Sequence, residues 1–383
     1  MKNLFSQIFF VSLFIFIFYS CSNDKVGNNT GDSTKSIKYP IMYKNDKPMD
    51  ERIHTIKLSK KFEIKRKDNA SLYVLCADKS NNFYATHWLT DTNGGDEIFI
   101  YDNKGHVKKS FGSKGQGPGE FKNAGRMSCV NDTIVLYDNN LCRVTKFNKD
   151  GIYQSMIKTT TTGAFYLVDS VCAYSDLKNS TNNTNYCFES LIGLKNIKTF
   201  HDSVIWRNKY CSDSPAFTIF DNLEPSIAID SENSLIYIGK LSVDEYKVDV
   251  FDFKGIKRSI INKHYKKINN NSDEIKEIKD QMGTYIKDLK SRYMRSFNKL
   301  YVDKKGRLLV NANAFRTKYN KKNYYIDVFE NGKYLFRTIL PEIEQHIFDY
   351  NQINFINDRL YISKAGEKPD DPNVLTCYEY EIE

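Results

Sequence analysis

Phe99–Gly105 reads FIYDNKG, and this pattern returns three times in altered form. The later copies are TKFNKDG at 145–151, DVFDFKG at 249–255 and IDVFENG at 326–332. Each copy is a β-type run, an aromatic residue, a short polar stretch and a glycine, and a second β-type run follows it. The pattern predicts a tight hairpin, since glycine accepts the positive φ that such turns require. A hairpin repeated at this spacing is typical of a β-propeller, in which four-stranded sheets surround a central channel.

The spacing of the repeated glycines gives the number of blades. Gly105 and Gly151 lie 46 residues apart, whereas Gly151 and Gly255 lie 104 residues apart, which is room for two periods of 52. A degenerate blade must therefore lie between them. Its candidate strands are Phe165–Val168, Val171–Tyr174, Tyr186–Leu191 and Thr199–Ile205. Together with the blades marked by the other repeats, the sequence predicts an all-β fold, a six-bladed β-propeller.

The last blade lacks a strand at the C-terminal end of the chain. Its third strand, Cys377–Ile382, is followed only by Glu383. An orphan β-type segment lies near the other end of the chain, at Ile53–Leu58 or Phe62–Ile64. We expect this N-terminal strand to complete the last blade, because closure of the ring removes the exposed edges that an open array would leave.

One spacing is too long for a single blade. Gly255 and Gly332 lie 77 residues apart, which leaves room for about one helix. Ser272 and the two acidic residues after it are typical of a helix N-cap and first turn. Apolar residues then follow at steps of three or four from Ile275 to Tyr293. We therefore expect an amphipathic helix inserted between blades four and five, which either braces the ring or binds a partner.

The N-terminus has the pattern of an export signal. Lys2 provides a positive charge, and residues 8–18 are almost wholly apolar but too few for a membrane-spanning helix of about 20 residues. Cys21 follows the small residue Ser20, and this arrangement resembles the lipoprotein box of bacteria. The resemblance implies that Cys21 is lipidated, and Ser22 in place of an aspartate favours the outer membrane. The alternative is an ordinary signal peptide with a coincidental cysteine.

These features divide the chain into three parts. Residues 1–20 are the signal peptide, residues 21–50 a lipidated flexible tether, and residues 51–383 the propeller with its N-terminal closing strand. The tether is rich in Asn, Asp, Ser, Thr, Lys and Gly and lacks the apolar side chains that packing requires. An export signal also implies an oxidising compartment.

Cysteine number and charge narrow the classes of function. Eight cysteines less Cys21 leave seven, so at least one stays unpaired. Cys172 and Cys187 can face each other across neighbouring strands, and most of the others are expected to be small buried residues. The 56 basic and 47 acidic residues give a net charge of +9, spread through the predicted turns. This spread favours a solvated surface, so we expect no nucleic-acid partner.

Strand order places the connections of a propeller on two faces. The turns from first to second strand and from third to fourth strand share the short-turn face. The connections from second to third strand and from blade to blade share the other face, and they are long, as at 87–97, 175–185, 311–323 and 364–376. Long loops on a rigid scaffold usually carry binding residues. The candidate ligand-binding residues on this long-loop face, over the central channel, are Trp88, Arg126, Arg143, Lys240, Arg316 and Lys364.

The loop Gly112–Phe121 reads GSKGQGPGEF. A phosphate-binding P-loop needs Gly-Lys-Ser/Thr leading into a helix, whereas this loop leads into another strand, which indicates a sharp crossover pinned by Phe121. A GQGPGEF loop after a first hairpin, behind a lipoprotein signal, resembles the six-bladed propeller lipoproteins related to the NHL-repeat and TolB-like groups. VDKKGRL at 302–308 also fits a turn of that family. The resemblance covers about residues 50–383 and implies the fold, since most members have no assigned activity.

Sequence signatures of catalysis are thin. The six histidines form no HxH or HExxH pattern, and the chain has no EF-hand loop and no GxSxG elbow. We therefore name no catalytic residue, no metal ligand and no cofactor. The leading hypothesis is a lipid-anchored envelope propeller that binds a glycan, a peptide or an envelope protein through its long-loop face. The alternatives are a lactonase-like hydrolase or lyase with its site at the channel mouth, and a purely structural envelope component.

Overall fold

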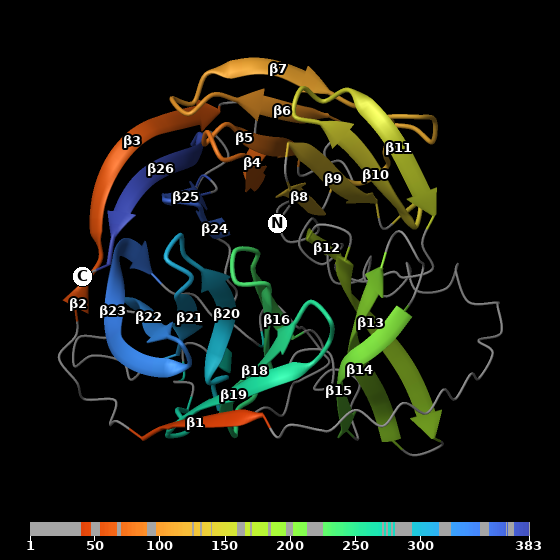
Figure 1. Cartoon of the computed structure of the whole chain (residues 1–383). Coiled ribbons are helices and arrows are strands. Elements are labelled where there is room, and N and C mark those ends of the chain that lie inside the picture. Colours follow the sequence, from red (N-terminus) through yellow and green to blue (C-terminus); the bar gives the residue numbers. More distant parts are fainter. Residues whose placement is uncertain are drawn as a thin grey trace.

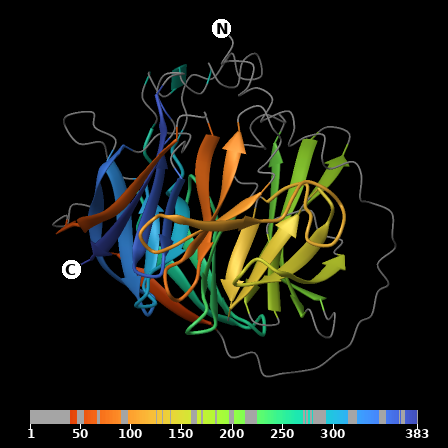
Figure 2. The same ribbon diagram turned by 90° about the horizontal axis from the view of Figure 1, so that it is seen from above.

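The computed structural model of the chain is a ring of six β-sheets around a central axis (Figure 1). Seen edge-on, the inner strands run roughly along this axis (Figure 2). The structure describes residues 40–46, 54–66, 70–89, 97–124, 126–130, 132–138, 140–158, 165–168, 171–182, 185–196, 202–212, 225–269, 272, 275, 276, 279, 293–313, 323–344, 352–364, 366 and 371–382. The predicted six-bladed all-β propeller is confirmed.

Each blade begins with its innermost strand and ends at the rim. Blade one contains β4 (Ala70–Ala77), β5 (Phe83–Leu89), β6 (Ile98–Tyr101) and β7 (Val107–Phe111). Blade two contains β8 (Arg126–Val130), β9 (Thr133–Asp138), β10 (Arg143–Asn148) and β11 (Tyr153–Lys158). Blade three, the degenerate blade, contains β12 (Phe165–Val168), β13 (Val171–Asn182), β14 (Asn185–Asn196) and β15 (Asp202–Ser212).

The second half of the ring follows the same plan. Blade four contains β16 (Ser226–Asp230), β17 (Leu235–Gly239), β18 (Tyr246–Asp252) and β19 (Lys257–Lys263). Blade five contains β20 (Phe297–Val302), β21 (Leu308–Ala312), β22 (Asn323–Glu330) and β23 (Lys333–Glu344). Blade six receives β24 (Gln352–Ile356), β25 (Arg359–Lys364) and β26 (Asn373–Glu381) from the C-terminal end.

The hydrophobic core lies between neighbouring blades. Between blades one and two, for example, Ile98 and Phe111 pack in one cluster with Phe121, Leu136 and Phe147. Phe121 and Leu136 are fully buried, at 0% exposure. Burial of each such side chain contributes roughly 1.5–3 kcal/mol, so packing between neighbouring blades makes a large contribution to stability.

The predicted closing strand is confirmed. β3 (Lys57–Arg66) pairs antiparallel with β26 and completes blade six. Its Phe62 ring stacks on Phe83 of blade one, with 5.5 Å between ring centroids. Gly105, at φ +88°, faces the same ring, and a Cβ there would lie 2.7 Å from Phe62 Cδ2. The closing strand therefore joins blade six to blade one by backbone pairing on one side and aromatic packing on the other.

Two further N-terminal strands lie on the rim, and we name β1, β2 and β3 together the N-terminal strap. β1 (Ile41–Asn45) pairs in parallel with β19 of blade four, and β2 (His54–Thr55) pairs in parallel with β23 of blade five. β1 falls in the segment 21–50 that composition predicts as a flexible tether. It is ordered because the open edge of β19 supplies its backbone hydrogen bonds.

Five turns of the short-turn face share one hydrogen-bond pattern. In blade one, Asp102 Oδ1 accepts hydrogen bonds from the backbone N–H groups of Lys104 and His106, each at 2.9 Å. The residues that begin a turn in this way are Asp78, Asp102, Asn148, Asp252 and Asp303. The side chain replaces a backbone acceptor, as in Asx turns, which explains why the repeat keeps Asp or Asn ahead of its glycine.

A buried ionic cluster joins blades four and five. Arg337 donates to both carboxylate oxygens of Asp327, through Nε at 2.7 Å and Nη2 at 2.9 Å. Tyr246 OH donates to Asp327 Oδ2 at 3.0 Å, and Lys263 Nζ lies 3.5 Å from the same oxygen. The Asp327 and Lys263 side chains are 0% and 1% exposed. We call these four residues the Asp327 cluster.

A disulfide joins the inner strands of blades one and two. Cys76 on β4 and Cys129 on β8 are bonded, with their Cα atoms 5.8 Å apart. The predicted approach of Cys172 and Cys187 is wrong, because Cys172 lies opposite Lys195 in the sheet and Cys187 lies opposite Ser180. Cys172 and Cys377 are buried free thiols, as expected for most of the cysteines.

The helix predicted between blades four and five falls largely on residues that the structure does not describe. Only 272, 275, 276 and 279 of that segment are described before 293, so the helix stays a prediction. Within the described ranges, no helix has the length and apolar content to cross a membrane.

Candidate functional site

The strand order locates the predicted ligand-binding residues. Five of the six lie at strand ends that point to the long-loop face: Trp88 near the end of β5, Arg126 at the start of β8, Arg143 at the start of β10, Lys240 just after β17, and Lys364 at the end of β25. Arg316 lies outside the described residues. The prediction that these positions share a face follows from the confirmed topology, and their role in binding stays a prediction.

Arg143 holds the glycine-rich loop. Its guanidinium donates to the carbonyl oxygens of Gln116 at 2.7 Å, Gly117 at 3.4 Å and Glu120. Phe121, at the end of the loop, is fully buried and its N–H donates to Ser113 O at 2.9 Å. The predicted crossover pinned by Phe121 is confirmed, and Arg143 has a structural role there, with only 5% exposure.

The other predicted cations are more open to solvent. Lys240 Nζ forms an ion pair with Glu245 Oε1 at 2.9 Å within the loop that follows β17. Lys364 is exposed and Arg126 is partly exposed at the first position of an innermost strand. These three side chains come from three different blades, so a ligand that touches all of them must cover the channel mouth.

Polar side chains of the innermost strands line the axis and bridge the blades. Lys299 Nζ on β20 donates to Ile353 O at 3.2 Å and to Asn354 Oδ1 at 3.4 Å on β24. Asn354 Nδ2 donates to Val74 O of blade one at 3.2 Å. These bonds join blades five, six and one at their innermost strands.

Arg295 lies at the long-loop end of blade five, two residues before β20. Burial alone lowers the pKa of its guanidinium to about 10, and no charged neighbour contributes to this shift. The side chain nevertheless keeps part of its surface open to solvent. Arg295 is therefore a further cation at the long-loop end of blade five. Sequence inspection missed it, because desolvation depends on the fold and Arg295 stands in an ordinary basic stretch.

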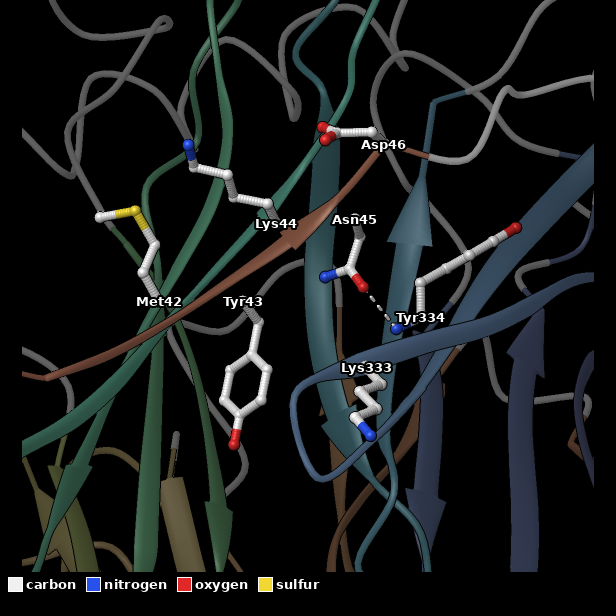
Figure 3. Close-up of a pocket in the computed structure, with 7 residues that line it drawn as sticks. All are labelled: Met42, Tyr43, Lys44, Asn45, Asp46, Lys333 and Tyr334. Carbon is white, nitrogen blue, oxygen red and sulfur yellow. Dashed lines mark hydrogen bonds between the residues drawn. The ribbon is translucent and has the colours of Figure 1, made fainter.

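A shallow hollow of about 410 Å³ lies on the rim, between the strap and the turn that joins β22 to β23 in blade five (Figure 3). Met42 to Asp46, Lys333 and Tyr334 line it. Asn45 lies at its centre: its Oδ1 accepts from Tyr334 N at 2.8 Å, and its Nδ2 donates to Asn262 O at 3.1 Å and Gly332 O at 3.2 Å. These contacts attach β1 to blades four and five. We therefore interpret the hollow as the place where the strap is attached, rather than as a second site.

The described residues place no three His, Cys, Asp or Glu side chains where they could hold a metal ion together. The innermost strands carry Arg126, Arg295, Asn298 and Ser226 at or near their long-loop ends, and the carboxylates Asp244 and Glu245 lie in the loop after β17 on the same face. This set suits hydrogen bonding to a polar or anionic ligand.

No family model and no curated protein matches the sequence. Among solved structures, a "putative exported protein" from Bacteroides fragilis aligns with a TM-score of 0.50 and 13% identity, over 90% of this chain and 100% of that chain. A member of the DUF4221 family from Bacteroides vulgatus has a TM-score of 0.44 and 12% identity, over 87% and 100% of the two chains. A gluconolactonase from Xanthomonas campestris has a TM-score of 0.43 and 8% identity, over 88% and 99%. At such identities the similarity to the Bacteroides fragilis protein is one of fold alone.

Proposed function

We propose that this chain is a lipid-anchored propeller of the cell envelope, related to the NHL-repeat and TolB-like propeller lipoproteins, that binds a glycan, a peptide or an envelope protein through its long-loop face. The observation that carries the proposal is the position of Arg126, Arg295 and Lys364, which lie at the long-loop ends of three different blades of one ring. Convergent polar groups on a rigid scaffold favour binding.

The location rests on two independent features. The N-terminal 21 residues have the order of a lipoprotein signal, ending at Cys21. The Cys76–Cys129 disulfide lies inside the ring and needs an oxidising compartment to form. Both features favour a protein that acts outside the cytoplasm, anchored by a lipid on Cys21.

Lipidation is tested by labelling. Cells that express the full chain with a C-terminal tag and grow with an alkyne-bearing fatty acid should incorporate the label into the wild-type protein. Cys21→Ser should abolish the label and release the protein from the membrane fraction, because a lipid chain contributes about 0.8 kcal/mol per buried CH₂. Cys377→Ser is the matched control, since its thiol is buried in the ring. Equal labelling of wild type and Cys21→Ser would reject the anchor.

The binding face is tested with a pair of matched variants. The tagged protein without residues 1–21 is first screened against immobilised glycans, peptides and solubilised envelope proteins. Arg126→Gln with Lys364→Gln should then weaken the binding found in the screen at least about tenfold, as expected for the loss of charged hydrogen bonds. Lys149→Gln with Lys254→Gln removes two exposed lysines from the short-turn face and should leave affinity unchanged. An equal affinity for both double variants would reject the long-loop face.

A further inference from the structure

The strands of the strap attach to three blades in chain order: β1 to blade four, β2 to blade five and β3 to blade six. The last of them closes the ring, and its register exposes it to a pull from the N-terminal side. Lys57, the first residue of β3, lies opposite Glu381 at the end of β26, whereas Arg66 lies opposite Asn373 at the beginning of β26. A load on the chain before Lys57 would therefore separate the pairs of β3 one after another, starting at Lys57.

β1 is held most firmly at its C-terminal end. Ile41 and Met42 are 59% and 55% exposed. Tyr43, by contrast, packs against a turn of blade five: a Cβ at Gly332, where φ is +80°, would lie 2.3 Å from Cδ2 of the Tyr43 ring. The side chain of Asn45 makes hydrogen bonds to three backbone groups of blades four and five (Figure 3). We call Tyr43 and Asn45 the latch, because they hold β1 to both blades.

β2 adds a second attachment before the closing strand. Thr338 Oγ1 donates to His54 O at 3.0 Å, and Ile56 N donates to Ile339 O at 3.1 Å. The Ile56 side chain is 1% exposed and belongs to the hydrophobic cluster that blades five and six share. A load that enters the described chain ahead of β1 must therefore undo the latch and these contacts before it reaches Lys57.

The two blades that would receive this load are joined to each other by the buried Asp327 cluster. Tyr246 OH of blade four donates to Asp327 Oδ2 of blade five at 3.0 Å. Lys263, which lies opposite Asn45 in the sheet, has its Nζ 3.5 Å from the same oxygen. The latch is thus attached directly above a seam that polar contacts already hold together.

We propose that β1 and β2 protect the closure of the ring from tension: they pass a pull on the N-terminal anchor to blades four and five and keep it away from β3. The inference rests on the proposed lipid anchor at Cys21, which would transmit such a pull when the propeller holds a partner and the lipid stays in the membrane. Tyr43 and Asn45 set the load that the attachment withstands, because the pairs of β1 before them can separate one at a time.

The test pulls on single molecules of the chain at constant force, with one handle in place of residues 1–21 and the other at the C-terminus. The wild type should lengthen in two stages. Release of β1 and β2 frees the chain from Ile41 to Lys57 and adds at most about 53–58 Å, since one residue spans at most about 3.3–3.6 Å. The ring should open only in a later step. Asn45→Ala should shorten the lifetime of the first stage about 10- to 100-fold, as expected for the loss of two or three hydrogen bonds.

Asn148→Ala is the matched control. Asn148 Oδ1 accepts two backbone hydrogen bonds in a turn of blade two, away from the strap. The same chemical change there should leave the lifetime of the first stage as it is in the wild type. Circular dichroism without load shows whether both variants keep the fold.

A second variant assigns the first stage to β1 without weakening the latch. Met42 and Ile260 are partners in the register of β1 and β19. A disulfide in the double variant Met42→Cys, Ile260→Cys should abolish the first stage, and dithiothreitol should restore it.

Two results would overturn the inference. A first stage of the wild type that adds more than about 58 Å would mean that β3 is released together with β1 and β2. A first-stage lifetime that Asn45→Ala leaves unchanged would remove the latch from the load path. Both measurements are independent of lipidation, because the handle replaces Cys21. Absence of the fatty-acid label at Cys21 would be a separate result, which rejects the anchor and with it the source of the pull.

Discussion

Asp327→Asn should lower the free energy of unfolding by about 3–5 kcal/mol, the largest effect we expect from one substitution. Asparagine keeps the shape of the side chain but removes the only carboxylate of the Asp327 cluster. Arg337 and Lys263 would then keep two positive charges in the interior between blades four and five. Urea denaturation followed by tryptophan fluorescence measures the change as a shift of the midpoint at constant slope.

Asp102→Asn is the matched control for this substitution. Asp102 begins a turn on the short-turn face, and in blade two Asn148 makes the same two turn hydrogen bonds through its amide oxygen. The same chemical change should therefore cost less than about 1 kcal/mol there. Similar losses at both positions would contradict a special role for the buried cluster.

The pH dependence of stability follows from the same cluster. Burial by itself would raise the pKa of Asp327, but the charges of Arg337 and Lys263 and the hydrogen bonds from Arg337 and Tyr246 hold it below its usual value. A carboxyl group with a lowered pKa in the folded state contributes stability above its unfolded pKa of about 3.9. This contribution is lost as the pH falls through the folded pKa. Wild type should therefore lose more stability than Asp327→Asn between pH 5 and the acid limit of folding, about pH 2 to 3.

Removal of the Cys76–Cys129 disulfide should cost about 4 kcal/mol. The bond closes a loop of 53 residues between the inner strands of two blades, and cross-links over loops of 15 to 100 residues contribute about 3–4.7 kcal/mol in the chain-entropy estimate. Cys76→Ala with Cys129→Ala should lower the urea midpoint to that of the wild type in reductant. The measurement is denaturation of both proteins with and without dithiothreitol.

The reductant also provides the control for this experiment. It should shift the wild type by more than the double alanine variant, and the difference between the two shifts measures the Cys76–Cys129 bond. Among the described side chains, Cys142, Cys172 and Cys377 are free thiols. Burial raises the pKa of the Cys377 thiol to about 11, so that thiol stays protonated and inert at neutral pH. A wild type that unfolds at the same urea concentration in both conditions would refute the bond.

The ring could be predicted from sequence because its signal is local and repeated. The turns between the third and fourth strands of blades one, two and four combine an Asp or Asn cap with a glycine of positive φ, as at Asp102 and Gly105. The spacing of the repeated glycines counts the blades. The closing strand was predictable for a related reason. A blade that ends at its third strand needs a fourth, and an unassigned β-type segment, Ile53–Leu58 or Phe62–Ile64, lay near the N-terminus.

The strap and the disulfide were missed because their partners are far away in the sequence. β1 has no alternation of apolar and polar residues and is held by the open edge of β19, more than 200 residues later. The pairing of Cys76 and Cys129 had one usable signal, a spacing of 53 residues that equals about one blade. Two cysteines on corresponding inner strands of adjacent blades lie close together in any propeller of this period.

The candidate site was predictable only in outline. Strand order was sufficient to place Arg126 and Lys364 on one face, because topology alone decides which strand ends point the same way. It could not show that Arg143 holds the glycine-rich loop, because that contact depends on how the loop folds back onto blade two. It also could not single out Arg295, whose altered pKa arises from the protein packed around it.

Ring closure by β3 also constrains the order of events during biosynthesis. β3 emerges early from the ribosome, whereas its partner β26 is nearly the last segment made. At roughly 5–20 residues per second, the roughly 300 residues between them take about 15–60 s to synthesise. A waiting β-strand is an aggregation hazard, and half of the ten residues of β3 are lysine or arginine, which repel other copies. We therefore expect the charge of this strand to keep copies of the chain apart until β26 is available for pairing.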